Sequence, residues 1–122
     1  GRDIALVADD SICVVRRHMF ERAVSNLLDN ALKFDQSGAP IGVEVQSGTV
    51  TVRDRGTGIP EGETTMVFER FHRAVNARTM PGSGLGLSIV ADVAETHGGS
   101  VFARNRADGG AEVGFSLPFG DR

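Results

Sequence analysis

The chain has 122 residues, of which 40% are hydrophobic and 24% charged, with a formal net charge of −3. These values predict one globular domain, in the range of about 100–150 residues that folds without metal or disulfide staples. The acidic balance excludes a nucleic-acid surface, which would need clustered Lys and Arg. With a single cysteine, Cys13, we expect no internal disulfide, a reducing compartment and a buried, unreactive thiol. No apolar run approaches the ~18–20 residues that span a bilayer, and no signal peptide opens the sequence, so we expect a cytosolic domain.

The first elements are predicted from short apolar runs and one long periodic segment. Residues 4–8 and 12–15 are each typical of a short strand. Residues 17–34 have the spacing of an amphipathic helix, which residues 36–40 interrupt. Its predicted buried face carries Phe20, Val24, Leu27, Leu28, Ala31 and Leu32.

The next two runs, 42–46 and 49–53, alternate valine with polar residues and meet at Ser47-Gly48. This pattern predicts a β-hairpin with one buried face. Residues 55–84 form a long connection with one short helical candidate, 65–71. Long connections in compact domains are usually functional lids or disordered segments.

A second amphipathic helix is predicted over residues 85–97, with Gly98-Gly99 as its C-terminal cap. Its predicted buried face carries Leu87, Val90, Ala91 and Ala94. Two alternating runs, 100–104 and 111–117, follow around the turn 108–110. The element order predicts an α+β two-layer sandwich, in which helices pack on one face of a mixed, largely antiparallel sheet.

One polar pattern lies on the first helix. Asn26, Asn30 and Lys33 are four and three residues apart and therefore project from one helical face. Asparagine is a poor helix former, and its carbonyl oxygen suits Mg²⁺, while Lys33 can offset phosphate charge. On local grounds alone, ordinary polar residues on a solvated helix face are the favoured interpretation.

A second pattern, Asp54-Arg-Gly56-Thr-Gly58-Ile59-Pro60, follows a predicted strand. Its glycines let the backbone approach a flat ligand, and the Asp54 carboxylate can accept from an exocyclic amine. A tight turn that closes the hairpin is the structural alternative.

Two further patterns follow. Phe68-Glu-Arg-Phe71-His-Arg73 fits a short packed helix as well as a lid anchor. Gly82-Ser83-Gly84-Leu85-Gly86 opens the second helix, where free N–H groups form a site for phosphate. It is neither a dinucleotide fingerprint nor a Walker A loop, because no strand precedes it and the only lysine lies elsewhere.

In combination and order, these patterns resemble the boxes of the histidine-kinase catalytic domain, of the gyrase, heat-shock chaperone, histidine kinase and MutL superfamily. NLLDNALKF resembles the N box, DRGTGIP the first glycine box, VFERFHR the F box and GSGLGLSIV the second glycine box. HGGSV and FSLP match the usual ending, so the resemblance covers about residues 4–118. It implies a Bergerat-type ATP-binding fold in one domain, 1–122, with an ATP lid at about 60–84.

The resemblance also implies roles for individual residues. Asn30 would ligate Mg²⁺, Asn26 would help to place the metal and phosphates, Lys33 would reach the phosphates, and Phe34 would pack near the adenine or ribose. Asp54 would accept from the adenine amine, in a pocket shaped by Gly56, Gly58 and Ile59. The phosphates would be held by Gly82, Ser83, Gly84, Leu85 and Gly86, with Arg73 as a further candidate.

Asn26 also indicates the branch of the superfamily. Hydrolysing relatives carry a glutamate one turn before the metal-binding Asn, where it activates water as a general base. An amide cannot take that proton, so we expect ATP to be held for transfer rather than hydrolysed quickly. Phosphoryl transfer needs mainly positioning and charge neutralisation.

The implied partners are a dimerisation and phosphoacceptor domain and a response regulator. None of His18, His72 and His97 has a phosphoacceptor context, so we expect the target histidine, the dimerisation helices and any sensor or membrane segment outside this chain. The domain alone is expected to be monomeric, and the full-length protein a membrane-bound homodimer. An anti-sigma-type serine kinase, or a nucleotide-binding regulatory module without transfer activity, remains an alternative.

Overall fold

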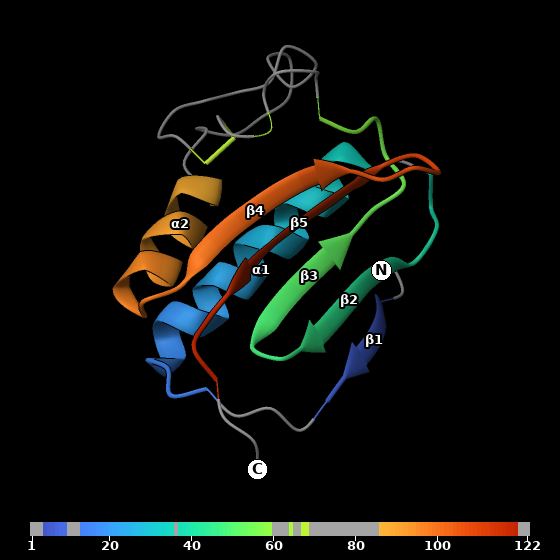
Figure 1. Cartoon of the computed structure of the whole chain (residues 1–122). Coiled ribbons are helices and arrows are strands. Elements are labelled where there is room, and N and C mark those ends of the chain that lie inside the picture. The colour runs from blue at the N-terminus through green and yellow to red at the C-terminus, as the bar shows by residue number, and fades with distance from the viewer. Residues whose placement is uncertain are drawn as a thin grey trace.

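A five-stranded sheet forms one layer of the molecule (Figure 1). The computed structural model describes residues 4–9, 13–35, 37–59, 64, 67–68 and 86–119. The strands are β1 (Ile4–Ala8), β2 (Ile41–Gln46), β3 (Thr49–Arg53), β4 (Ser100–Asn105) and β5 (Ala111–Ser116), in the order β1-β2-β3-β5-β4. Only the β1–β2 pairing is parallel among the described strands, which confirms the predicted mixed, largely antiparallel sheet.

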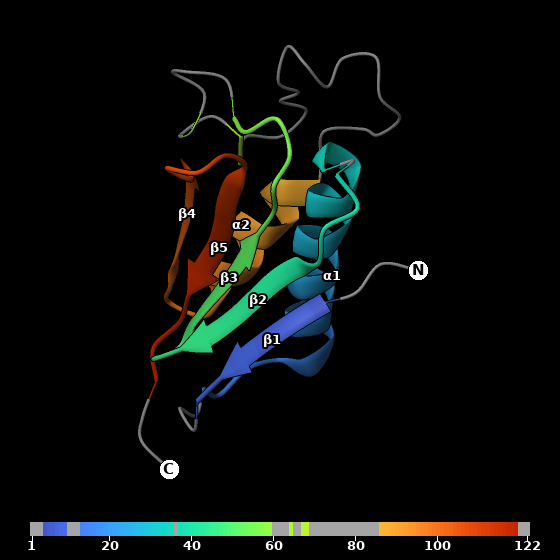
Figure 2. The ribbon, with the colours of Figure 1, turned by 90° about the vertical axis from the view of Figure 1, so that its right-hand side faces the viewer.

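Helices α1 (Arg17–Phe34) and α2 (Gly86–Thr96) lie on the same face of this sheet (Figure 2). The buried core lies between the two layers. Phe115 of β5 is fully buried there, and its ring meets that of Phe20 from α1 edge-on, with the centroids 5.8 Å apart. The predicted α+β two-layer sandwich is therefore confirmed.

The buried face of α1 is narrower than its sequence predicts. Ala23, Leu27 and Ala31 are buried at successive turns, and Phe20, Val24 and Leu28 pack partly against the core. Leu32 is 43% exposed, so its predicted burial is wrong. One residue after Ala31 it is rotated by about 100° from the buried line, and it falls at the edge of the face.

The segment that precedes α1 is extended but is not a strand. Residues 13–16 belong to no helix or strand, so the strand predicted at 12–15 is wrong over 13–15, and residue 12 lies outside the described residues. The alternation that suggested it is real, because Cys13 and Val15 pack on the core while Val14 is 94% exposed. Alternation predicts an extended chain, whereas a strand also needs a neighbour with which to exchange hydrogen bonds.

Cys13 is half-buried, rather than buried as expected. Burial, with a smaller effect from the Asp9 carboxylate, raises the pKa of its thiol. A raised thiol pKa lowers the thiolate fraction, as expected for an unreactive cysteine.

The hairpin and the cap of α2 agree with their sequence signals. Ser47 and Gly48 both have positive φ, at 51° and 75°, as a type I′ hairpin turn requires. At the end of α2, Gly98 N–H donates to Glu95 C=O and Gly99 N–H to Ala94 C=O, which is a Schellman cap. The buried face of α2 contains the predicted Val90 and Ala94, but Ser88 and Val93 replace Leu87 and Ala91, which are partly buried.

The N-terminus of α1 is fixed by a side chain from α2's end. Arg16, the N-cap residue, makes no side-chain cap hydrogen bond. Its backbone N–H donates to Nε2 of His97 over 2.9 Å, and Nδ1 of the same ring lies 2.7 Å from Val93 C=O. His97 is therefore structural, and it joins the two helices at the end of the domain away from β3's C-terminus.

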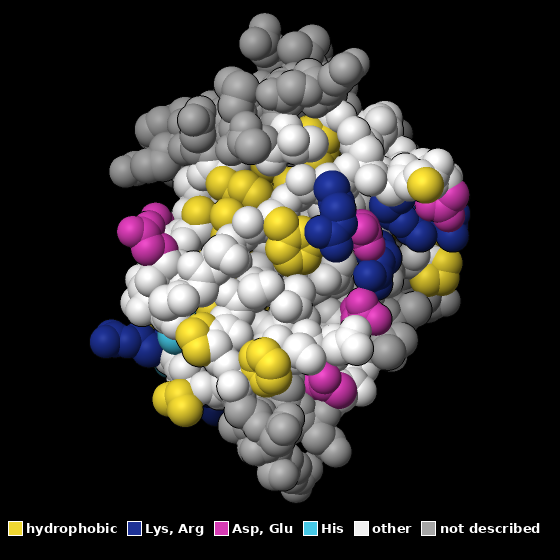
Figure 3. Space-filling model, viewed as in Figure 1, with side chains coloured by type: hydrophobic (Ala, Val, Ile, Leu, Met, Phe, Trp, Pro, Cys, Tyr) yellow, Lys and Arg dark blue, Asp and Glu magenta, His cyan; other side chains and the backbone are white. Residues whose placement is uncertain are grey.

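The outer face of the sheet carries charged side chains of alternating sign (Figure 3). Arg53 pairs with Glu44 and Glu112, and Arg104 also pairs with Glu112. These pairs are partly exposed, so each contributes little to stability. The helices thus cover only one side of the sheet.

Candidate functional site

The site forms where the C-terminal end of α1 meets the loop that follows β3. A Cβ atom on Gly56 would lie 2.1 Å from Phe34 C=O and 3.0 Å from the Asp35 Cα. The absence of a side chain at Gly56 thus allows the loop to lie directly on the helix end. The fold therefore places Phe34, at the end of the first predicted group, beside Gly56 of the second.

Asn26, Asn30 and Lys33 lie on the part of α1 that leads to this junction. All three are partly buried. The Lys33 ammonium lies 5.8 Å from the centroid of the Phe34 ring. The Asn26 Nδ2 atom is buried and has no hydrogen-bond partner among the described residues. An unpaired buried amide destabilises the folded protein and calls for a partner, which a bound ligand would supply.

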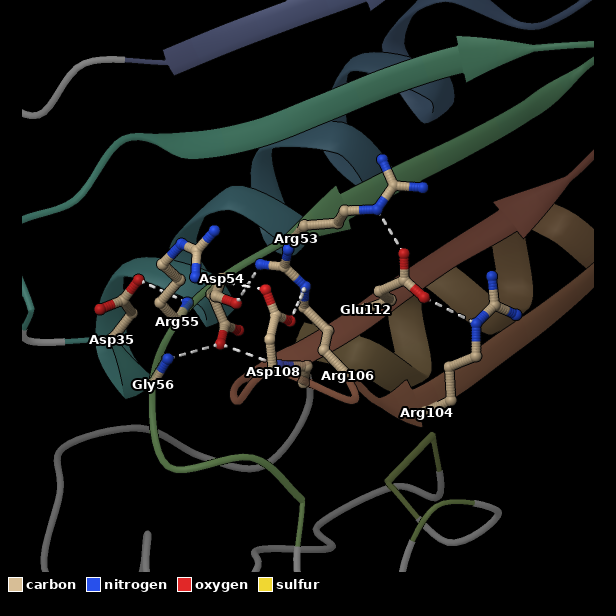
Figure 4. Close-up of polar contacts among 10 residues, drawn as sticks. Asp35, Arg53, Asp54, Arg55, Gly56, Arg104, Arg106, Asp108 and Glu112 are labelled. Carbon is tan, nitrogen blue, oxygen red and sulfur yellow. Dashed lines mark hydrogen bonds and ion pairs between the residues drawn. The ribbon is translucent and has the colours of Figure 1, made fainter.

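Asp54 is the buried carboxylate of the loop, at 4% exposure. Its Oδ1 accepts from the backbone N–H groups of Gly56, at 2.9 Å, and Ala111, at 3.1 Å (Figure 4). Both hydrogen bonds that this carboxylate receives from the described residues go to Oδ1, so Oδ2 is the oxygen that a ligand can engage.

Burial is the main reason that the pKa of Asp54 is raised above its ordinary value. The two backbone N–H groups oppose this effect, because they stabilise the carboxylate. The nearby Asp35 carboxylate raises the pKa further, while the Arg106 guanidinium lowers it.

Asp35 is fully buried at the first position after α1 and links the two parts of the site. Its Oδ2 accepts from the Arg55 N–H over 2.8 Å (Figure 4). Its Oδ1 accepts from the Ser37 N–H over 2.8 Å. One carboxylate therefore holds the residue beside Asp54 and also the chain that leaves α1.

The far end of the loop is held by β4. The Ile59 N–H donates to Asn105 Oδ1 over 2.6 Å, and Asn105 Nδ2 donates to Ile59 C=O over 2.9 Å. Gly58 has φ +79°, and a Cβ there would lie 2.8 Å from Asn105 Oδ1. Glycine at 58 thus provides both the left-handed backbone and the room for the amide.

The β4–β5 turn makes a third set of contacts with the loop that follows β3. Arg106 Nη1 donates to the Asp54 backbone C=O over 3.0 Å. Asp108 pairs with Arg55, at 3.4 Å, and with Arg106, at 3.5 Å (Figure 4). These contacts surround Asp54 with chain from three separate parts of the sequence.

Several predicted site residues cannot be placed. Arg73, Gly82, Ser83, Gly84 and Leu85, and most of the lid predicted at about 60–84, lie outside the described residues. Of the helix predicted at 65–71 only Val67 and Phe68 are described, in a turn, and Phe68 packs partly against the core. Gly86 is the first residue of α2, and a Cβ there would meet nothing within 4 Å.

Sequence reasoning missed three residues that hold this loop, namely Asp35, Asn105 and Arg106. Their contacts reach 20, 46 and 52 residues along the chain, so no local spacing could reveal them. Asp35 offered one signal, because a charged residue directly after a helix and next to a predicted site is a candidate for a buried, paired role.

Comparison with known proteins settles the family. The family of histidine kinase-, DNA gyrase B- and HSP90-like ATPases matches residues 16–121. The chain belongs to this family. The signal transduction histidine-protein kinase/phosphatase MprB of Mycobacterium sp. (strain KMS) is 47% identical over 101 residues, which cover 79% of this chain and 20% of that protein. In Mycobacterium ulcerans (strain Agy99) the protein of the same name is 42% identical over 101 residues, with the same coverage of 79% and 20%.

Solved structures give the same grouping. The mycobacterial sensor histidine kinase MprB superposes with a TM-score of 0.88 at 35% identity and covers 98% of this chain and 85% of that one. The ATP-binding domain of PrrB from Mycobacterium tuberculosis has a TM-score of 0.75 at 32% identity, with coverage of 98% and 82%. The resemblance to the histidine-kinase catalytic domain is thus confirmed. The chain spans 20% of the length of the curated MprB relative, and no helix within its described residues is long and apolar enough to cross a membrane.

Proposed function

We propose that this chain binds Mg-ATP and donates its γ-phosphate to a histidine on a separate dimerisation domain of a sensor histidine kinase, which then supplies a response regulator. The observation that carries the proposal is the buried Asp54 carboxylate, with Oδ1 occupied by backbone N–H groups and Oδ2 left for a ligand donor. A carboxylate oxygen in such a place suits the exocyclic amine of adenine. The family supports this reading, and full-length ShkA, a similar structure with a TM-score of 0.75 at 26% identity, has been solved in complex with AMPPNP.

We assign the remaining predicted residues to roles around this adenine contact. Gly56, Gly58 and Ile59 would complete the pocket, and Phe34 would pack near the adenine or ribose. Asn30 would ligate Mg²⁺ through its amide oxygen, a ligand type that this ion accepts. The unpaired Asn26 Nδ2 and the Lys33 ammonium would face phosphate oxygens. Arg73 and residues 82–86 remain phosphate contacts by resemblance.

Asn26 sets the expected chemistry. It stands where a hydrolysing relative would hold its general base, and an amide cannot accept a proton from water. The bound nucleotide would therefore persist until an acceptor histidine arrives, and the residues of this chain would act by positioning and by offsetting charge. Mg²⁺, when bound, would neutralise phosphate charge. We expect steady-state ATP turnover by this chain alone to be very slow, and a rate like that of a dedicated ATPase would contradict the role assigned to Asn26.

The kinase proposal further places this chain in the cytoplasmic part of a membrane-bound homodimer, with the dimerisation and phosphoacceptor domain as its immediate partner. Mixing the chain with that domain from an MprB-type kinase, with Mg-ATP, tests the transfer step directly. Acid-labile phosphate on the partner supports a histidine acceptor, whereas acid-stable phosphate points to a serine kinase.

The first test of binding is calorimetric titration with ATP, ADP and GTP, each with and without Mg²⁺. We expect selective binding of the adenine nucleotides and a response to ATP that depends on Mg²⁺. Asp54→Asn replaces the acceptor by an amide of the same size and should weaken ADP binding by about 100-fold or more, which corresponds to roughly 2.7 kcal/mol. Unchanged affinity of a folded Asp54→Asn variant would disprove the adenine contact.

A further inference from the structure

Asn105 makes an unusual contact for a residue at the end of an edge strand. It is the last residue of β4 and pairs with Ala111 in the ladder. Its carboxamide engages both backbone groups of Ile59, the N–H at 2.6 Å and the C=O at 2.9 Å. Backbone groups in a loop pair with other backbone, with side chains or with water, and here one side chain satisfies both.

This contact decides what Ile59 can offer to a ligand. Because its N–H donates to Asn105, the backbone of Ile59 has no donor left for a ligand, and its apolar side chain packs at the edge of the core. Gly58 is fitted to the same contact, because its missing Cβ leaves room for the Asn105 amide. The loop from Asp54 to Ile59 is thus tied at its start by Asp35 and at its end by Asn105.

We propose that Asn105 is a positioning residue for the purine pocket, which holds Ile59 in register with Asp54 so that both act on the same ring. The inference rests on the proposed nucleotide binding and extends it to a residue on β4. Asp54 would supply the polar acceptor and Ile59 the apolar wall. Their relative placement depends on the tether because Gly56 and Gly58 give the intervening backbone wide conformational freedom.

A purely structural role for Asn105 is the competing explanation. The Asn105 side chain is exposed, so its hydrogen bonds compete with water and support the fold only weakly. A structural tie would change the melting temperature and leave the choice between purines untouched. A positioning role would change nucleotide affinity and purine selectivity, with little change in melting temperature.

The test compares wild-type chain with Asn105→Ala, which removes both hydrogen bonds, and Asn105→Asp, which keeps the size and the acceptor but sets an oxygen against Ile59 C=O. Arg104→Ala is the matched control, since it removes an exposed polar contact from the preceding residue of β4. For each protein the dissociation constants of ATP and GTP are measured by calorimetry with Mg²⁺, and the melting temperature by circular dichroism. We expect both Asn105 variants to bind ATP about tenfold or more weakly, with a smaller ATP-to-GTP preference, and the control to match wild type.

The outcomes separate the two proposals. If wild type binds ATP selectively and both Asn105 variants retain its affinity and preference, the positioning role is wrong and the proposed function stands. If only Asn105→Ala weakens binding, the side-chain volume or the bond to Ile59 N–H, both of which Asn105→Asp keeps, is sufficient, and the proposed tether through both backbone groups of Ile59 is wrong. If wild type binds neither nucleotide while folded, the proposed function fails and this inference fails with it.

Discussion

At the scale of one residue, the Asp54 carboxyl is buried and its pKa is raised. Its negative charge, which the proposed binding of adenine requires, therefore lowers the stability of the folded protein. A group whose pKa is raised by folding stabilises the protein below its unfolded pKa, and this contribution is lost as pH rises through the folded pKa. Ionised Asp54 therefore destabilises the folded protein at neutral pH, and a ligand donor at Oδ2 would relieve part of that effect.

The raised pKa of Asp54 predicts how the stability of the Asp54→Asn variant, relative to wild type, changes with pH. Asparagine keeps an oxygen for the Gly56 and Ala111 N–H groups but does not titrate. The free energy of unfolding of the variant minus that of wild type should rise with pH, beginning at the ordinary Asp pKa and levelling off above the raised one. Urea denaturation over a pH series measures this difference, in which other titrating groups largely cancel. A difference that falls with rising pH would mean that folding lowers the pKa of Asp54.

Gly56 and Gly86 make a matched pair of glycines with opposite surroundings. A Cβ on Gly56 would strike the backbone of Phe34, whereas a Cβ on Gly86 meets nothing within 4 Å. We expect Gly56→Ala to lower the free energy of unfolding by about 1–3 kcal/mol and Gly86→Ala to leave it unchanged or raise it by up to about 1 kcal/mol. Denaturant titration of both variants gives the comparison. Equal stabilities would show that the loop does not lie against the end of α1.

Residue types pointed to the Asp54 loop, which is proposed to face the ligand, but they gave no indication of the contacts that hold this loop. The Asp-x-Gly-x-Gly spacing indicated a carboxylate in a close-fitting loop because both glycines follow Asp54 within four positions. Asp35 and Asn105 act on that loop from 20 and 46 residues away. Such contacts depend on how α1 and β4 are placed by the sheet, which local sequence does not encode.

At the scale of elements, hydrophobic periodicity predicted both helices and all five described strands to within about two residues, because each has one buried face. The prediction from periodicity failed where alternate residues are buried although the segment is not part of the sheet. Cys13 and Val15 face the core as in a strand, yet residues 13–16 form no strand pairing with any other described residue. Leu32 follows the helical repeat but falls beyond the width of the sheet-facing stripe.

The N-terminus of α1 lacks features that normally stabilise the start of a helix. Arg16 has an extended backbone, with φ −81° and ψ 115°, but no capping side chain, and the first turn has no acidic residue. Arg16→Asp should raise the free energy of unfolding by about 1 kcal/mol, through a cap hydrogen bond and a favourable charge at the helix N-terminus. The His97 contact uses the Arg16 backbone and is retained. Arg16→Asn separates the two effects, since it caps without charge, and no gain in either variant on thermal denaturation would contradict the argument.

For the molecule as a whole, the site joins parts that are distant in the chain. It is built on α1, the end of β3 and the β4–β5 turn, all of which pack on or belong to one sheet. A ligand that binds these parts together stabilises only the folded state, and by an amount that grows with its concentration. The binding energy should therefore appear in the unfolding of the entire domain rather than of one loop.

We expect the protein to unfold in one cooperative thermal transition, and Mg-ATP to raise the temperature of this transition. At a free concentration of about 100 times the dissociation constant the stabilisation is roughly 2.7 kcal/mol, which for a domain of this size is a shift of several degrees. Scanning calorimetry over a series of Mg-ATP concentrations measures it, with Mg-GTP and the Asp54→Asn variant as controls that should shift little. Two separate transitions, or an equal shift with GTP, would show that the loop and the helix end do not act as one adenine-selective site, because a site built jointly by these parts is lost in one cooperative unfolding step.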